Sequence, residues 1–262
     1  MININGYPIG NDCYPNNERI MKIPKFSNDE FEIDFKYTTD IDISILIIVK
    51  GYLDDMFNNP KVTLRMKYVP YSRMDRYIKG YIFSLKYFCK IINNLNFHKV
   101  IVLDTHSNIT TALLERCTEI DISKYINKIY DMINIDYIFY PDAGSIKRYE
   151  EIIKAKRQSF YGIKKRDLQT GNIINYDIVD CPDIQGKDIL IIDDLCSYGG
   201  TFQLASEKLK EKGANNMYLY VSHCEDSIYQ GKLIKSGLIS KIFTTDSILS
   251  DWSSKLISNV EE

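Results

Sequence analysis

The sequence predicts an α/β fold with two domains, each built on a mostly parallel sheet flanked by helices. The apolar runs Lys99–Leu103, Tyr137–Tyr140 and Ile189–Ile192 are too short for helices and are typical of buried parallel strands. Segments with helical spacing alternate with these runs, as in Tyr81–Leu95, whose apolar residues repeat on one face. Such strand–helix alternation favours parallel sheets with helices on both faces.

Composition places the chain among ordinary globular proteins. Its 262 residues, 45% hydrophobic and 26% charged, suffice for two modest domains, expected at residues 1–118 and 119–262. A formal charge of -2 gives no global attraction to nucleic acid or to an acidic membrane, so neither is expected as a specific partner. No apolar run is long enough to span a bilayer, and the N-terminus lacks a signal-peptide pattern, so we expect a cytoplasmic protein.

The first half is expected to begin irregularly and then to enter its sheet. Residues 1–42 are polar, with a turn-prone YPNNE at Tyr14–Glu18 and a short strand expected after it. Ile43–Val49 and Lys61–Val69 are predicted to be buried strands. The second of these ends in a dense charged segment, PYSRMDR, at Pro70–Arg76. Charge gathered at a strand end indicates a site at the edge of the sheet.

The same pattern continues after the strand Lys99–Leu103, which runs into DTHS at Asp104–Ser107. The strand Tyr137–Tyr140 likewise runs into PDAG, and a basic segment, KAKRQSFYGIKKR, follows at Lys154–Arg166. The remaining elements expected are helices at Asn108–Cys117 and Ser145–Ala155, a flexible hairpin or flap at Gln169–Asp183, and strands at Met217–Ser222 and Lys241–Thr245.

The most informative stretch is DILIIDDLCSYGGTFQLASEKLKEKG, which begins at Asp188. Its apolar strand ends in two carboxylates, and a turn of hydroxyl residues and paired glycines precedes a helix that Gly213 ends. Backbone N–H groups of such a turn can converge on an anion at the helix N-terminus, and Thr201 can cap the helix. The stretch therefore predicts a phosphate-binding turn, made of Ser197, Tyr198, Gly199, Gly200 and Thr201, beside the acid pair Asp193 and Asp194.

This stretch resembles the phosphoribosyl pyrophosphate motif of the type I phosphoribosyltransferase-like proteins, although Ser197 and Tyr198 stand where Asp and Thr are usual. The resemblance implies that the acid pair binds ribose hydroxyls and that the turn holds the 5-phosphate. The series PYSRMDR, DTHS, PDAG, KKR and DDLCSYGGT is more specific. It resembles the ribose-phosphate diphosphokinases, also called phosphoribosyl pyrophosphate synthetases, over roughly Tyr14 to Ser247, as a divergent short member with two phosphoribosyltransferase-like domains.

The resemblance implies transfer of the diphosphoryl group of ATP to the anomeric hydroxyl of ribose 5-phosphate, with Mg²⁺ as cofactor. His106 and Asp142 match the positions of the family that are linked to magnesium, and His106 is also counted among the catalytic residues. Lys164 and Arg166 best fit the K-x-R spacing of the catalytic flap, with Lys165 as the alternative lysine. Taken alone, the basic run would be interpreted as a solvated surface.

The resemblance also implies a nucleotide site and a homo-oligomer, because the adenine loop of the family acts across a subunit boundary. Met74 replaces a usual glutamine, and the YPNNE loop departs from the F-x-D-G-E pattern of the family. The implied ATP contacts are Arg73, Met74 and Asp75, together with Tyr14, Asn16 and Glu18.

Two other interpretations remain open. A phosphoribosyltransferase would share the last motif and would use phosphoribosyl pyrophosphate as a substrate, but the full motif series argues against it. A non-catalytic regulator that binds phosphoribosyl pyrophosphate is favoured by the altered adenine loop and opposed by His106, Asp142 and the KKR segment.

Overall fold

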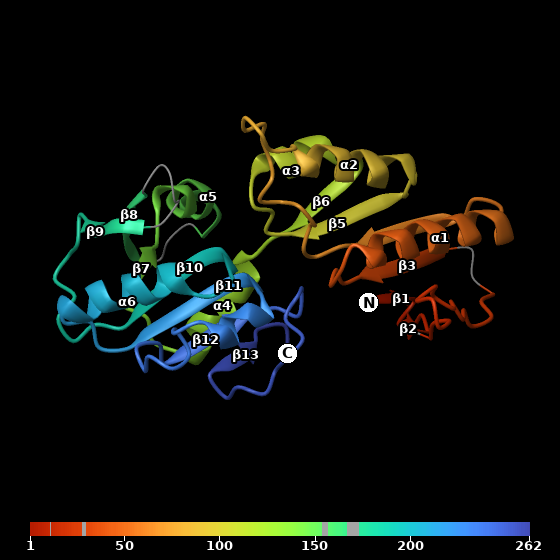
Figure 1. Cartoon of the computed structure of the whole chain (residues 1–262). Helices are drawn as coiled ribbons and strands as arrows, with labels where there is room; N and C mark the ends of the chain where they lie inside the picture. Colours follow the sequence, from red (N-terminus) through yellow and green to blue (C-terminus); the bar gives the residue numbers. More distant parts are fainter. Residues whose placement is uncertain (11, 28–29, 154–156, 167–172) are drawn as a thin grey trace. The chain divides into compact units, whose positions relative to one another are not determined.

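The computed structural model describes the chain from Met1 to Glu262 except residues 11, 28–29, 154–156 and 167–172. The chain divides into two compact units, Met1–Ile120 and Asp121–Glu262, called here the first and second unit. Each unit contains one sheet and one hydrophobic core (Figure 1). The predicted α/β architecture with two mostly parallel sheets is confirmed.

The first unit contains a six-stranded sheet in the order β2-β1-β3-β4-β5-β6. Strands β3 to β6 are parallel neighbours in chain order, whereas β1 is antiparallel to both β2 and β3. Helices α1, α2 and α3 lie together on one side of this sheet (Figure 1). The elements are β1 Ile2–Ile4, β2 Tyr7–Pro8, β3 Glu30–Phe35, α1 Ile41–Met56, β4 Lys61–Arg65, α2 Ser84–Asn94, β5 Lys99–Leu103, α3 Asn108–Leu113 and β6 Cys117–Ile120.

The prediction of a buried strand at Ile43–Val49 was wrong, because this run lies inside helix α1. Its apolar residues cover most of the helix circumference: Leu46, Val49 and Leu53 are fully buried, whereas Ile48 is 53% exposed. A helix that is apolar on several faces cannot be told from a buried strand by its composition.

The strand that enters this sheet is β3, which the sequence analysis overlooked within the segment described as irregular, as it did β1 and β2. Phe31, Ile33 and Phe35 point into the core in strict alternation with partly or fully exposed residues. Period-two burial is the expected pattern for a strand with one covered face. The strand expected directly after YPNNE is absent from the described residues there, apart from an isolated bridge between Cys13 and Arg19.

The second unit contains a seven-stranded sheet in the order β13-β12-β11-β10-β7-β8-β9. All neighbouring strands are parallel except β8 and β9, which form an antiparallel hairpin. The elements are α4 Ser123–Met132, β7 Tyr137–Tyr140, α5 Ala143–Ile153, β8 Gln158–Arg166, β9 Ile173–Val179, β10 Ile189–Cys196, α6 Gly200–Glu211, β11 Met217–Cys224, the 3-10 helix η1 Asp226–Gln230, β12 Lys241–Thr244 and β13 Ile257–Asn259.

Strand β8 contains residues 158–166 of the basic segment, whose residues 154–156 lie outside the described part. The predicted hairpin or flap at Gln169–Asp183 contains β9, and its residues 169–172 are likewise outside the described part. The helix expected at Asn108–Cys117 ends at Leu113, and Cys117 begins β6. Among the described residues, no helix combines the length and the apolar character needed to cross a bilayer.

Candidate active site

The second sheet changes its winding direction between β7 and β10. From β7 the chain crosses through α5 to β8 on one side, and from β10 it crosses through α6 to β11 on the other. Because such crossovers are right-handed, α5 and α6 cover opposite faces, and the carboxyl ends of β7 and β10 form the topological switch point, where ligands bind in sheets of this kind. The pairing of β7 with β10 ends at Ile191 opposite Phe139, and both predicted acidic motifs follow this point.

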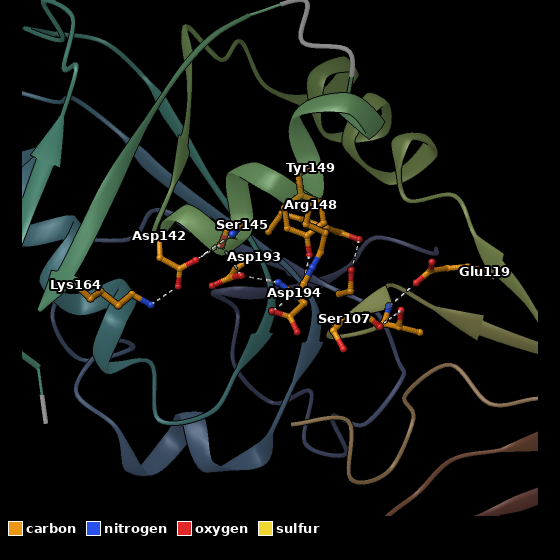
Figure 2. A network of polar contacts seen from close by, with 12 residues as sticks. Ser107, Glu119, Asp142, Ser145, Arg148, Tyr149, Lys164, Asp193 and Asp194 are labelled. Atoms are coloured by element: carbon orange, nitrogen blue, oxygen red, sulfur yellow. Dashed lines mark hydrogen bonds and ion pairs between the residues drawn. The ribbon is translucent and has the colours of Figure 1, made fainter. Parts of the chain in front are cut away.

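Asp142 and Asp193 are linked at this switch point through one serine. Ser145, in the first turn of α5, donates its backbone N–H to Asp142 Oδ1 at 3.0 Å. Its hydroxyl oxygen lies 3.2 Å from Asp142 Oδ1 and 2.9 Å from Asp193 Oδ1 (Figure 2). On the other side, Lys164 Nζ of β8 donates to Asp142 Oδ2 at 2.8 Å, and the lysine side chain is only 11% exposed. The structure thus connects the PDAG motif, the acid pair and the basic segment.

The electrostatics of the two carboxyl groups are opposite. Burial, followed by the nearby charges of Asp194 and Asp142, raises the pKa of Asp193 well above its ordinary value of 3.8, although the residue keeps some surface exposure. Burial would also raise the pKa of Asp142, but the Lys164 ammonium and the hydrogen bonds from Ser145 outweigh it and lower that pKa. The Ser145 hydroxyl lies within hydrogen-bond distance of both carboxyl groups, so one serine links them.

Asp194 is held by a residue that the sequence analysis missed. Arg148 of α5 lies 2.9 Å from Asp194 Oδ1, and its guanidinium stacks 5.5 Å from the ring centre of Tyr149 (Figure 2). Asp194 is only 6% exposed, so its carboxylate is buried although it lies at a strand end. Helical spacing was the available signal, because Ser145 and Arg148 are three residues apart and share one face of α5.

The predicted phosphate turn, residues 197–201, connects β10 to α6. Gly199 has a left-handed backbone at φ +78° and precedes the first residue of α6, Gly200. Thr201 lies inside the helix, and no side chain caps the helix start, so the predicted role of Thr201 as a cap was wrong. Tyr198 is 58% exposed, and a Cβ placed on Gly200 would meet nothing within 4 Å. The space beside Gly200, at the start of α6, is therefore open.

The hairpin that carries Lys164 is anchored next to the PDAG motif. Tyr176 of β9 is buried and donates its hydroxyl to the carbonyl of Pro141 at 3.0 Å. A Cβ on Gly162 would lie 2.2 Å from that hydroxyl oxygen, so this position requires glycine. Lys165 and Arg166 pair through their backbones with Asn175 and Ile173, but their side chains lie outside the described part of the structure.

In the first unit, the PYSRMDR and DTHS motifs are neighbours. Asp75 is 2% exposed and accepts a hydrogen bond from Arg76 Nε at 2.8 Å. Burial would raise its pKa, but Arg76 together with the side chains of Ser107 and His106 lowers it. Thr105 donates its N–H to Glu119 Oε1 at 2.5 Å, which fixes the turn that carries the partly exposed His106 (Figure 2).

The other residues implied in ATP binding are more exposed. Arg73 is exposed and Met74 is half-buried in the loop between β4 and α2. The segment from Tyr14 to Glu18 forms a tight turn in which the Tyr14 N–H donates to the Glu18 carbonyl at 2.9 Å and the Glu18 N–H donates to Asn16 Oδ1 at 3.2 Å. Tyr14 is 55% exposed, so its ring has a free face on which a base could stack.

Within the described residues, no three His, Cys, Asp or Glu side chains are grouped so that they could hold a metal ion. Magnesium usually binds through one or two carboxylates together with substrate phosphates and waters, so such a cage is not required. Burial is the first cause of the raised pKa of Asp193, and the nearby charges of Asp194 and Asp142 add to it, so a positive charge bound beside these oxygen donors would be favourable. The donors present therefore fit magnesium.

Comparison with known proteins bears on the chain as a whole. No protein-family model matches it. The ribose-phosphate pyrophosphokinase of Sulfurisphaera tokodaii is 28% identical over 252 residues, which cover 91% of this chain and 84% of that protein. The ribose-phosphate pyrophosphokinase of Sulfolobus acidocaldarius is 27% identical over 268 residues, with 97% and 89% covered. The crystal structure of phosphoribosylpyrophosphate synthetase from Mycobacterium smegmatis superposes with a TM-score of 0.76 at 17% identity, covering 96% of this chain and 85% of that one.

The α/β fold of the chain is similar to that of phosphoribosylpyrophosphate synthetase, and its acid cluster lies at the switch point of the second sheet. The resemblance stated from the motifs is confirmed by the curated relatives. The chain is a transferase similar to the ribose-phosphate pyrophosphokinases over most of its length.

Proposed function

We propose that the chain transfers the diphosphoryl group of ATP to the anomeric hydroxyl of ribose 5-phosphate, giving 5-phosphoribosyl 1-diphosphate and AMP. The observation that carries the proposal is a series of hydrogen-bonded side chains at the switch point of the second sheet, next to the phosphate turn. Lys164 contacts Asp142, and Ser145 links Asp142 to Asp193. Names of relatives, which are ribose-phosphate pyrophosphokinases, support the same reaction.

The sugar phosphate is assigned to the second unit. The turn at residues 197–201 presents backbone N–H groups at the N-terminus of α6, where a phosphate is favoured by the helix dipole. Asp193 and Asp194 lie at the start of this turn and accept hydrogen bonds from the ribose hydroxyls. Arg148 holds the Asp194 carboxylate in place from α5, so part of the cost of ordering that side chain is already met before the sugar binds.

Lys164 is assigned to the transferring group. In diphosphoryl transfer the protein contributes mainly position and counter-charge, because charge shifts among phosphate oxygens as AMP leaves. The Lys164 ammonium lies at the carboxyl end of β7, where Asp142 orients it, and the hairpin fixed by Tyr176 supports it. Lys165 and Arg166, next on β8, are further candidates for this role.

Nucleotide binding is assigned to the first unit. The buried Asp75, close to Arg76 and His106, supplies an acceptor of fixed position, and the exposed Tyr14 supplies a stacking ring. In the second unit, Asp142 would hold magnesium; in the first unit, His106 is the other position that the resemblance links to magnesium. When bound, it supplies positive charge that neutralises phosphate oxygens.

The proposal is tested by incubating the full chain with ATP, ribose 5-phosphate and magnesium, followed by phosphorus NMR. Formation of AMP and a diphosphorylated sugar in equal amounts is expected. Consumption of phosphoribosyl pyrophosphate with a nucleobase, without AMP release from ATP, would instead identify a phosphoribosyltransferase. Binding of phosphoribosyl pyrophosphate with no turnover in magnesium or manganese would identify a regulator.

A further inference from the structure

The residues that follow β11 pack behind the phosphate turn. Strands β10 and β11 pair in register up to Cys196 and Cys224, so Ser197 and Glu225 leave the sheet side by side. The Glu225 N–H donates to the Cys196 carbonyl at 2.8 Å. The carboxylate oxygen Oε2 of Glu225 accepts a hydrogen bond from the Ser197 hydroxyl and another from the Ser227 hydroxyl at 3.0 Å. The segment 225–233, called here the supporting segment, thus begins with a side chain that is hydrogen-bonded to the turn.

Two glycines allow this segment to approach the turn closely. A Cβ on Gly231 would lie 1.9 Å from the carbonyl oxygen of Tyr198, so only glycine permits the observed backbone contact. A Cβ on Gly199 would lie 2.9 Å from Cβ of Leu233. The supporting segment therefore contacts three successive residues of the turn, Ser197 through Glu225, Tyr198 through Gly231 and Gly199 through Leu233.

We infer that Glu225 is a positioning residue for sugar-phosphate binding, acting through Ser197. The inference rests on the proposed function, because it concerns the same phosphate turn. The proton of the Ser197 hydroxyl is committed to Glu225, so the turn binds phosphate through its backbone N–H groups and not through this hydroxyl. Glu225 fixes the conformation in which those groups converge, and its negative charge is offset by the two hydroxyl donors on one oxygen.

This arrangement also explains why an acid can stand so near an anion site. A free carboxylate would repel phosphate, whereas a carboxylate that accepts hydrogen bonds from the protein side is held behind the turn as part of its support. Ser227 lies in the supporting segment and Ser197 in the turn, so the Glu225 carboxylate links the two. Loss of the Glu225 side chain should loosen the turn and leave the sheet intact.

The experiment measures ribose 5-phosphate affinity by calorimetry for wild type, Glu225→Ala and Glu225→Gln. Because a charge-assisted hydrogen bond is lost, Glu225→Ala should bind about tenfold to a hundredfold more weakly. Glu225→Gln retains an acceptor oxygen and should lie between Glu225→Ala and wild type. ATP affinity should not change, and in turnover the KM for ribose 5-phosphate should rise more than kcat falls. Glu211→Ala, at the exposed end of α6, is the matched control.

A double-mutant cycle with Ser197→Ala isolates the contact. If Glu225 acts through Ser197, Ser197→Ala should lower the affinity for ribose 5-phosphate. The double variant should then bind no more weakly than the single variant with the lower affinity. Circular dichroism and thermal unfolding establish whether each variant is folded. If Glu225→Ala does not fold, Ser197→Ala still tests the contact, because it removes only one oxygen atom.

Wild-type affinity in Glu225→Ala, or additive losses in the cycle, would overturn the inference while leaving the proposed function standing. A Gln variant as weak as Ala would exclude the acceptor role. A wild-type chain that does not bind ribose 5-phosphate would refute the proposed function itself and the inference with it.

Discussion

At the scale of single residues, the ionised form of Asp193 destabilises the folded chain. Its pKa is raised by burial and by Asp194 and Asp142. The folded state therefore binds a proton that the unfolded state releases at lower pH, and stability falls as the pH rises from 3.8 through the raised pKa. Asp142, whose pKa is lowered, acts in the opposite direction and loses its contribution as the pH falls.

We expect Asp193→Asn to raise the Tm at neutral pH. The amide oxygen still accepts from Ser145 and from the Asp194 N–H, while the unfavourable charge is gone. The gain should shrink as the pH falls from the raised pKa towards 3.8, and it should be smallest below 3.8, where wild type is protonated in both states. Thermal unfolding followed by circular dichroism across this range checks it, with the exposed Asp131→Asn as control. A Tm gain that is constant at every pH would contradict the explanation.

Lys164 is expected to act mainly in turnover. Lys164→Ala should lower kcat by on the order of a hundredfold to a thousandfold, with a smaller change in substrate affinity, because a preorganised charge matters most when charge shifts. The double change Lys164→Ala with Lys165→Ala covers both candidate lysines. Lys208→Ala is the control, because Lys208 forms an exposed ion pair with Glu211 whereas Lys164 is 11% exposed. Wild-type turnover in the double variant would contradict a role of these lysines in the reaction and leave β8 as a charged surface strand.

At the scale of elements, two adjacent glycines in the β10–α6 connection are expected to have different roles, one in stability and one in binding. Gly199 is left-handed and packs on Leu233, so Gly199→Ala should destabilise the chain by about 1 to 2 kcal/mol from the backbone alone. Gly200 is not left-handed and faces open space, so Gly200→Ala should leave stability nearly unchanged and weaken ribose 5-phosphate binding. Urea unfolding and calorimetry on both variants measure the two effects.

A Cβ at Gly200 would meet nothing within 4 Å, and the residue does not have a left-handed backbone. A loss of binding in Gly200→Ala would therefore come from the space proposed for the anion and not from backbone strain. The residue with the backbone constraint is its neighbour, Gly199. If Gly200→Ala destabilised the chain more than Gly199→Ala did, this division of roles would be wrong.

At the scale of the whole molecule, we expect a homo-oligomer, as the resemblance implies. Helix α1 agrees with this expectation, because Ile48 and Met56 are 53% and 63% exposed and Tyr52 is 40% exposed. Apolar side chains gathered on one surface are often covered by another chain. Static light scattering under assay conditions measures the mass, and a value equal to the 30.5 kDa monomer at all concentrations would refute the expectation.

Several features were predictable because they depend on neighbours in the sequence. The strands at Lys99–Leu103 and Tyr137–Tyr140 match β5 and β7 residue for residue, since each is a short apolar run bounded by polar residues. Helix α1 was not predictable in this way, because its apolar residues serve both the core and the exposed face. The strand β3 was missed because its alternating pattern, EFEIDF, contains as many acidic as apolar residues.

By itself, the sequence determined the α/β class, the order of the acidic motifs and the glycine-rich turn, because strand length, turn chemistry and helix starts are local properties of the chain. Only the tertiary structure decided which groups meet. The order of strands in the sheet brings together side chains that are far apart in the sequence. Ser145 contacts Asp193 across 48 residues, Arg148 forms an ion pair with Asp194, and Glu225 accepts a hydrogen bond from Ser197. Their charges then set the pKa values at the site, which no local pattern contains.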